Sequence, residues 1–233
     1  MPKAYSPQDK YFHLAKKLGY RARSAFKLEE ILDKYPFLLP VHGNIVDLGS
    51  APGSFLQILQ ERQKRGKLCG VDLKPIEPFS KTNPQYFQCF VGDVFADETL
   101  KEVLHFLGTE RVDFITSDLA PNTSGVRDID QWKSIELNER VLEVAEKILK
   151  PGGHLITKIF QGEDFQEFWV ESFRSRFQTA KVFKPQACRD RSFEVFLIGM
   201  GWKPLPKQKD APANFSTTPM VPHTPDAPWC PFE

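Results

Sequence analysis

The sequence has few cysteines and no long hydrophobic run. Four cysteines occur among 233 residues, and they are far apart: Cys69, Cys89, Cys188 and Cys230. Neither they nor the five histidines have the paired spacing of a zinc site, so we expect no metal. No segment approaches the ~20 apolar residues that cross a bilayer, and residues 1–17 lack the apolar core of a secretory signal. These absences predict a protein of the cytoplasm, where thiols remain reduced.

The chain carries little net charge, but its basic residues are unevenly distributed. The formal net charge at pH 7 is +1. Residues 1–27 contain seven basic residues against the single acid Asp9, a local net charge of +6. The basic residues are Lys3, Lys10, Lys16, Lys17, Arg21, Arg23 and Lys27. Such an arm is typical of a surface that binds nucleic-acid phosphates, although an ordinary solvated helix face explains it equally well.

Prolines concentrate near the carboxyl-terminal end of the sequence. Eight of the 19 prolines lie within residues 203–233, and large aliphatic residues are scarce there. Because this composition does not build a hydrophobic core, we predict an extended tail. Residues 1–202 are predicted to form a single domain that includes the basic arm.

Apolar runs typical of buried strands recur along the chain. Strands are expected at residues 44–48, 68–73, 86–91, 112–117, 154–160, 180–183 and 193–199. Helices are expected at residues 24–32, 54–65, 98–107, 131–149 and 165–177. This alternation predicts an α/β, Rossmann-like fold in which helices cover both faces of a mostly parallel seven-stranded sheet. Only residues 184–192 separate the last two strands, too few for a parallel crossover, so the last strand is predicted to be antiparallel.

Two helix boundaries carry a local signal. Asp97 precedes the helix expected at residues 98–107 and is predicted to cap it. Pro151-Gly152-Gly153 is expected to end the preceding helix.

A loop of small residues follows the first strand and leads directly into a helix. Gly49 and Gly53 in that loop let the backbone turn sharply and approach a ligand closely. Acidic residues, Asp72 and Asp93, end the next two strands. Ligands of open α/β sheets bind at this edge, where Asp72 could hold a ribose diol and Asp93 an adenine amino group. Capping would explain either acid alone, but the combination favours a bound nucleoside.

Charged residues also lie at the ends of the later strands. Asp118 follows the fourth strand, and Lys158 interrupts the apolar run of the fifth. A lysine is costly inside a central strand unless it reaches a cleft or a partner. Glu194 begins the antiparallel strand and is therefore expected at the same edge of the sheet. Lys27 comes from the helix that precedes the first strand.

Five motifs resemble those of the FtsJ-type ribose 2′-O-methyltransferases. In chain order they are YRARSAFKL, VDLGSAPGSF, SDLAPNTSG, TKIFQG and RDRSFEVF, and with their surroundings they cover about residues 5–200. The resemblance implies a class I methyltransferase fold, S-adenosylmethionine as the methyl donor and an RNA ribose as the acceptor. Two features depart from the family pattern. Ser54-Phe55 replaces a frequent Gly-Trp pair, and the proline-rich tail has no counterpart in the compact bacterial form.

The resemblance also implies roles for individual residues. It places a catalytic tetrad at Lys27, Asp118, Lys158 and Glu194. It places cofactor contacts at Gly49, Ala51, Pro52, Gly53, Phe55, Asp72, Asp93, Val94 and Asp118. The ribose hydroxyl must lose its proton as it attacks the sulfonium methyl group, and a neutral amine at Lys158 can accept that proton. The charges of Lys27 and the sulfonium disfavour a second cation, while Asp118 orients Lys158 and Glu194 positions the hydroxyl or Lys27.

Basic residues near this edge are predicted to contact RNA phosphates: Arg21, Arg23, Arg189 and Arg191. Surface salt bridging is the alternative role for each of them. In length and motif pattern the chain most resembles the family members that methylate a uridine of large-subunit (23S) ribosomal RNA, so the resemblance implies this target, and we expect a monomeric enzyme. Two other functions stay open: methylation of a transfer RNA anticodon loop, and a non-catalytic RNA-binding role in ribosome assembly.

Overall fold

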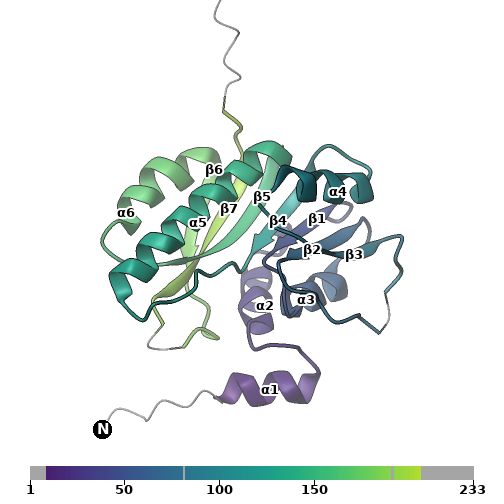
Figure 1. Cartoon of the computed structure of the whole chain (residues 1–233), viewed down its shortest axis with the longest axis horizontal. Helices are drawn as coiled ribbons and strands as arrows, with labels where there is room; N and C mark the ends of the chain where they lie inside the picture. Colours follow the sequence, from purple (N-terminus) through teal and green to yellow (C-terminus); the bar gives the residue numbers. More distant parts are fainter. Residues whose placement is uncertain (1–8, 81, 190–191, 206–233) are drawn as a thin grey trace, which may run out of the picture.

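A seven-stranded sheet with the strand order β3-β2-β1-β4-β5-β7-β6 forms the centre of the molecule (Figure 1). The computed structural model describes residues 9–80, 82–189 and 192–205. The strands are β1 (Ile45–Leu48), β2 (Leu68–Asp72), β3 (Phe87–Val91), β4 (Val112–Ser117), β5 (Leu149–Phe160), β6 (Phe177–Phe183) and β7 (Glu194–Trp202). Strands β1 to β5 are parallel, whereas β7 is antiparallel to both β5 and β6. The predicted fold class is confirmed.

Helices cover both faces of the sheet. In chain order the helices are α1 (Lys10–Leu18), α2 (Ala25–Lys34), the short η1 (Pro36–Leu38), α3 (Ser54–Arg62), α4 (Asp97–Leu107), α5 (Arg127–Ile148) and α6 (Phe165–Glu167). On one face, α2 and α3 bury Leu28 and Leu56 against the sheet. On the other, α4 and α5 form a second core that includes Val103. Ile45 belongs to the first core and Val46 to the second, because successive strand residues point to opposite faces.

The boundary between α5 and β5 differs from the prediction. α5 ends at Ile148 and β5 begins at the next residue, so Pro151-Gly152-Gly153 lies within the strand rather than before it. The pairing of β5 with β4 shifts register between Val112 and Phe114. Such a bulge accommodates proline and glycine, which a regular central strand would exclude.

The segment predicted as one helix at residues 165–177 consists of three short pieces. The single turn of α6 is followed by a π-helical turn, η2 (Phe168–Phe173), and a 3₁₀ turn, η3 (Arg174–Arg176). Phe168 and Phe173 lie five positions apart, and both are buried in the second core. Because the i→i+5 bonding of a π turn brings such residues to one face, burial of the two rings overrides the α-helical pattern.

Two aspartates act differently at helix starts. The sequence did not predict α1, which Asp9 caps by accepting the backbone N–H groups of Tyr11 and Phe12 at 3.1 Å. Asp97, predicted to cap α4, is instead its first helical residue. Its carboxylate accepts a 2.6 Å hydrogen bond from Lys147 Nζ on α5, so it joins two helices rather than capping one.

The topology brings the carboxyl ends of the parallel strands and the amino end of β7 to one edge of the sheet. Glu194, the first residue of β7, pairs with Phe160 at the end of β5. Ser117, the last residue of β4, pairs with Thr157 of β5. Charged side chains at or just beyond these positions therefore gather at the same edge.

The described chain continues only briefly after β7. Residues 206–233, which include most of the predicted tail and Cys230, lie outside the described residues. The division into a domain of residues 1–202 and a tail of residues 203–233 therefore stays a prediction. Within the described ranges, none of the helices has the length and hydropathy needed to cross a membrane.

Candidate active site

Lys158 points from the central strand β5 to a carboxylate at the edge of the sheet. Its Nζ lies 2.8 Å from Asp118 Oδ1 and donates a hydrogen bond to the Asp118 carbonyl oxygen at 2.7 Å. Lys158 is only 7% exposed, and the two contacts offset the cost of removing an amine from water. Asn138 of α5 donates to the Lys158 carbonyl oxygen at 2.9 Å and holds the strand backbone in place.

A second ion pair, between Lys27 and Glu194, lies at the same edge. Lys27 Nζ is 2.6 Å from Glu194 Oε1, and both side chains are largely buried. Burial alone would lower the pKa of Lys27, but the carboxylates of Asp118 and Glu194 outweigh it and raise that pKa above its usual value. Burial, with Glu194 nearby, also raises the pKa of the Cys188 thiol to about 12. Lys27 is therefore a cation at neutral pH, and the neighbouring thiol stays protonated.

A cavity of about 700 Å³ opens at this edge and includes Asp118 in its wall. Six of the predicted cofactor residues line it: Gly49, Ala51, Asp72, Asp93, Val94 and Asp118. They come from the loop after β1, the end of β2 and the segments that follow β3 and β4. The cavity lining carries four carboxylates, those of Asp72, Asp93, Asp118 and Glu136, which suit a ligand that carries positive charge and hydroxyl or amino donors.

The loop after β1 has a conformation that leaves no space for a side chain at Gly49. Gly49 has a φ of +72°, and a Cβ at this position would come within 2.5 Å of the Leu119 side chain. Asp72 Oδ2 accepts the Ala51 N–H at 2.9 Å, while its Oδ1 accepts the Lys74 N–H at 2.8 Å. Asp72 therefore joins the loops after β1 and β2, which form one wall of the cavity.

The sequence model of FtsJ-like methyltransferases matches residues 20–202. The chain belongs to this family. Ribosomal RNA large subunit methyltransferase E of Anaeromyxobacter dehalogenans is 41% identical to it, over 87% of this chain and 74% of that protein. The protein of the same name from Myxococcus xanthus is 40% identical, over 86% and 92% of the two chains. A crystal structure described as a ribosomal RNA methyltransferase from Plasmodium falciparum aligns with a TM-score of 0.68 and 26% identity, over 78% of this chain and 98% of the other.

Membership in the FtsJ-like family identifies S-adenosylmethionine as the methyl donor. The cavity fits this molecule, because Asp72, Asp93 and Asp118 offer acceptors and negative charge to hydroxyl, amino and sulfonium groups. The contact of each residue with the cofactor stays a prediction. Among the described residues, no cluster of three or more His, Cys, Asp and Glu side chains could hold a metal ion.

Three of the predicted cofactor residues do not line the cavity of this FtsJ-like methyltransferase: Pro52, Gly53 and Phe55. Phe55 lies in the first turn of α3 and is 2% exposed. Its ring packs against Phe196 of β7, with 6.2 Å between the centroids. Phe55 therefore belongs to the core beneath the loop rather than to the cavity wall, because its place on α3 directs it toward the sheet.

Arg23, predicted to contact RNA, has its guanidinium bonded within the protein. It pairs with the carboxylate of Asp9 and donates to the Ala187 carbonyl oxygen. Arg189 lies beside the same carboxylate, with its Nε 3.9 Å from Asp9 Oδ2. Arg191 lies outside the described residues. For Arg23 the geometry favours the structural alternative over a phosphate contact.

Arg21 is also engaged by the protein itself. Its Nη1 and Nη2 donate to the carbonyl oxygens of Pro52 and Pro78 at 2.9 and 2.8 Å. The guanidinium lies over the ring of Phe79, with its Cζ 3.8 Å from the centroid. This side chain is directed at the backbone of the cofactor loop rather than into solvent.

Eleven further residues line the cavity, and none of them is among the predicted cofactor contacts. They are Leu73, Lys74, Phe95, Leu119, Ala120, Pro121, Asn122, Trp132, Lys133, Glu136 and Leu137. Trp132, near the start of α5, is 59% exposed and offers a planar surface at the cavity. Asp130 holds the loop after β4 by accepting the N–H groups of Ser124 and Gly125 at 2.6 and 3.2 Å. The sequence offered one signal for these residues: Trp132 and Glu136 are spaced i, i+4 and therefore share one face of the helix.

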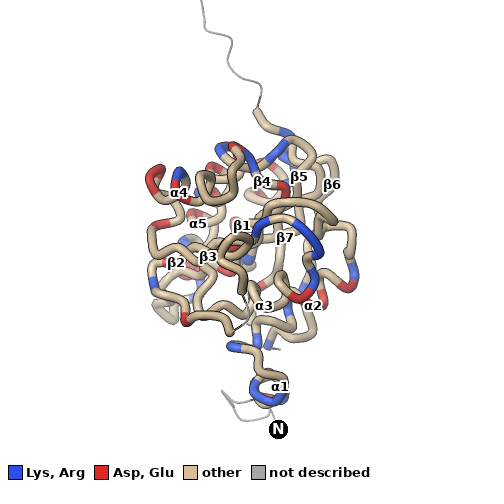
Figure 2. The backbone as a smooth tube through the Cα atoms, turned by 90° about the vertical axis from the view of Figure 1, so that its right-hand side faces the viewer, with Lys and Arg blue, Asp and Glu red and all other residues tan. Residues whose placement is uncertain are grey.

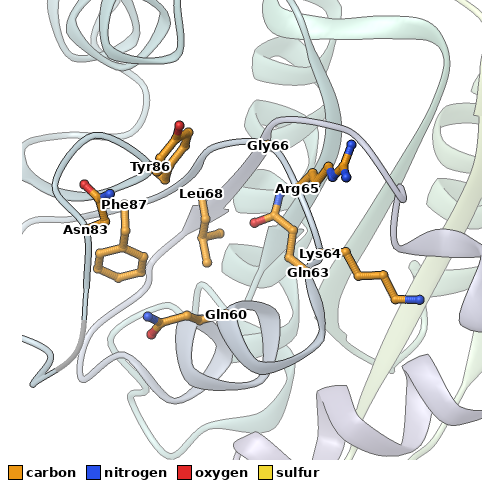
Figure 3. Close-up of a pocket in the computed structure, with 9 residues that line it drawn as sticks. All are labelled: Gln60, Gln63, Lys64, Arg65, Gly66, Leu68, Asn83, Tyr86 and Phe87. Carbon is orange, nitrogen blue, oxygen red and sulfur yellow. The ribbon is translucent and has the colours of Figure 1, made fainter.

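A second cavity, of about 560 Å³, lies at the amino ends of β2 and β3 (Figure 3). Gln60, Gln63, Lys64, Arg65, Gly66, Leu68, Asn83, Tyr86 and Phe87 line it. Leu68 and Phe87 begin their strands, whereas Asp72 ends β2. This cavity is therefore at the opposite edge of the sheet from the paired lysines and carboxylates, and it is separate from the methyl-transfer site.

Proposed function

We propose that this protein transfers a methyl group from S-adenosylmethionine to the 2′-hydroxyl of a ribose in large-subunit ribosomal RNA, at a uridine. The observation that carries the proposal is the meeting of the Lys158–Asp118 and Lys27–Glu194 pairs at the edge where four carboxylates line a cavity. The relatives from Anaeromyxobacter dehalogenans and Myxococcus xanthus are named for the large-subunit RNA, which supports this choice of substrate.

In the proposed reaction Lys158 is the general base. Its Nζ accepts the proton of the 2′-hydroxyl while the ribose oxygen forms a bond to the methyl carbon and the carbon–sulfur bond breaks. The bound S-adenosylmethionine supplies the electrophilic methyl group. Asp118 orients the Lys158 amine through its carboxylate and its carbonyl oxygen. As the general base, the Lys158 amine must be neutral at the moment it accepts the proton.

Lys27 and Glu194 prepare the acceptor side of the site. The Lys27 cation would stabilise the negative charge that develops on the ribose oxygen, and its effect is stronger in a buried site than in water. Glu194 holds that cation at 2.6 Å. Since both charges are in place before the substrate arrives, little reorganisation accompanies the reaction. Positioning of the two reactants then supplies much of the rate.

Cofactor binding is assigned to the carboxylates of the cavity. Both oxygens of Asp72 accept backbone N–H groups, and each retains a second lone pair for a ribose hydroxyl. Asp93 is proposed to accept from the adenine amino group, and Asp118 to lie near the sulfonium. These assignments follow the order in which the strands end along the edge of the sheet.

The RNA surface is proposed to include α1, whose exposed basic side chains are separate from the engaged arginines. Tyr11 of α1 packs against Phe26 of α2, with 5.6 Å between ring centroids, and fixes the helix to the body. Lys16 and Lys17 of α1 are exposed, and neither forms an ion pair within the described residues. Figure 2 shows basic positions along α1. The exposed ring of Phe12 adds a surface on which an unpaired base can stack.

We further propose that the enzyme acts as a monomer in the cytoplasm. All four tetrad residues and the cavity come from a single chain, which supports a monomer. Cys69, Cys89 and Cys188 are free thiols, as is usual in a reducing compartment.

The proposal is tested by incubating the full chain with S-adenosylmethionine that carries a labelled methyl group. One reaction contains large ribosomal subunits from cells that lack this enzyme, and a parallel reaction contains bulk transfer RNA. We expect label in the large-subunit RNA, and mapping of alkali-resistant positions should place it on the ribose of a uridine. Label only in transfer RNA would move the substrate and keep the chemistry. Label in neither would favour a binding role in ribosome assembly.

A further inference from the structure

Arg21 bridges two backbone segments that are far apart in the sequence. One bonded carbonyl belongs to Pro52, in the loop between β1 and α3, and the other to Pro78, in the segment after β2. Both distances, 2.9 and 2.8 Å, are those of good hydrogen bonds. A guanidinium suits this task because its donors lie in one rigid plane, whereas an ammonium is a compact point charge.

The bridge is closely packed. The guanidinium lies on the ring of Phe79, next to Pro78, at 3.8 Å from the centroid. A Cβ at Gly53 would come within 2.8 Å of Phe79 Cζ and 3.0 Å of Arg21 Nη1. Gly53 also has a φ of +106°, which a residue with a side chain rarely adopts. The absence of a side chain at Gly53 therefore lets the ring and the guanidinium approach the loop.

The two bridged segments continue directly into the wall of the cofactor cavity. Ala51 precedes Pro52, lines the cavity, and donates its N–H to Asp72. Leu73 and Lys74 line the cavity at the start of the segment that contains Pro78. Arg21 and Asp72 thus join the same two loops: Asp72 through Ala51 and Lys74, and Arg21 through Pro52 and Pro78.

The segment around Arg21 is itself fixed on α3 and leads to the catalytic lysine. Gln57 of α3 accepts the Arg21 N–H at 2.8 Å and donates to the Gly19 carbonyl oxygen at 2.9 Å. The Ser24 and Ser54 hydroxyl oxygens are 2.7 Å apart. α2, which carries Lys27, begins immediately afterwards. The chain that joins the basic helix α1 to Lys27 is therefore also a part of the support of the cofactor loop.

We propose that Arg21 is a positioning residue for S-adenosylmethionine, which it affects by joining the two loops of the cofactor wall, and that it is not a phosphate ligand of the RNA. The inference rests on the identity of the methyl donor and not on which RNA is methylated.

The test compares Arg21→Lys and Arg21→Gln with the wild-type enzyme by calorimetric titration of S-adenosylmethionine without RNA. Loss of two charge-assisted hydrogen bonds is expected to weaken cofactor affinity by about 10-fold to 100-fold. Arg21→Lys should also bind the cofactor more weakly than wild type, although it keeps the positive charge. At saturating cofactor, kcat should stay within about threefold of wild type, so that the effect is on the KM for S-adenosylmethionine.

Arg62→Lys is the matched control. Arg62 also joins α3 to another element, through ion pairs with Glu29 and Asp33 of α2, but it does not contact the cofactor loop. Its variant should bind S-adenosylmethionine within about twofold of wild type. If Arg21→Lys fails to fold, Phe79→Leu provides the second test, because it removes the stacking surface and leaves both hydrogen-bond acceptors in place.

The opposite result is clear. An unchanged cofactor affinity in Arg21→Lys and Phe79→Leu, together with a smaller salt dependence of RNA binding in Arg21→Gln, would overturn the inference and restore Arg21 as a phosphate ligand. Because the titration contains no RNA, its outcome is independent of the methyl-transfer assay. Failure of this inference is therefore distinguishable from failure of the proposed function.

Discussion

Lys158 is the side chain whose chemistry the proposed reaction requires most directly. Replacing it with methionine keeps most of the volume and removes the amine. We expect methyl transfer by Lys158→Met to fall by about 10²-fold to 10⁴-fold, the range of general-base catalysis. Cofactor affinity should change by less than about threefold, since Lys158 is not among the residues that line the cavity. The measurement is single-turnover transfer of labelled methyl at saturating cofactor.

Lys150→Met provides the control for that experiment. Lys150 lies on the same strand and forms an ion pair with Asp113 at 2.7 Å, near the other end of β5. Its variant should turn over at the wild-type rate. Wild-type turnover in Lys158→Met as well would show that Lys158 is not the base.

Because the Asp47 carboxyl is buried, we expect the stability of the protein to depend on pH. Asp47 is 1% exposed, and Thr116 donates to its Oδ1 at 2.6 Å. Burial raises the pKa of Asp47 well above its usual value, and the nearby Asp118 and Asp72 raise it further. The folded state therefore keeps this proton over a pH range in which the unfolded chain, with a pKa of about 3.9, has lost it. The protonated Asp47 therefore contributes its full stabilisation of the folded state below the unfolded-state pKa. This contribution is lost as the pH rises toward the folded-state pKa.

Asp47→Asn removes this titration and should change the pH profile in a defined direction. Urea unfolding at about pH 5 and pH 8 should show the variant gaining stability relative to wild type at the higher pH. Asp97→Asn is the control, because Asp97 is exposed and its partner is Lys147 on the surface. A difference between Asp47→Asn and wild type that is constant with pH would show that Asp47 is ionised in the folded protein.

At the scale of elements, α1 is the surface to test for RNA binding. Lys16→Glu with Lys17→Glu should weaken RNA affinity and reduce the slope of log K against log salt by about two, one for each lost phosphate contact. Lys101→Glu with Lys147→Glu reverses the same number of exposed charges on α4 and α5 and should have little effect. Equal losses in the two double variants would show that α1 has no special role and that only the overall charge matters.

At the scale of the whole molecule, cofactor binding and folding are linked. A ligand at about 100 times its Kd stabilises the folded state by about 2.7 kcal/mol. For a domain of this size that corresponds to a rise in Tm of roughly 5–10 °C. Asp72→Ala should lose most of this rise at the same cofactor concentration, since Asp72 both joins the loops and is the proposed ribose ligand. A wild-type shift in Asp72→Ala would contradict that assignment, whereas Asp97→Ala should retain the full shift.

The order of the strands and the positions of the charged residues along them could be predicted from the residue pattern alone. Short apolar runs marked all seven strands. The central strands are buried on both faces and so tolerate few polar side chains, whereas the edge strands β3 and β6 are only partly buried. The lysine within β5 was recognisable for the same reason, since its cost implies a partner. The expected direction of each strand then predicted that Asp118, Lys158 and Glu194 lie at the same edge of the sheet.

The partner of each side chain, in contrast, became clear only in the folded molecule. The same basic arm could hold phosphates or bind the protein, and the fold directed Arg21 to two backbone carbonyls and Arg23 to Asp9. It placed Phe55 in the core and replaced the middle of a predicted helix with a π turn that buries Phe173. The physical reason is the same in each case. Periodicity records which residues avoid water, whereas partners depend on contacts between segments that are distant in the sequence.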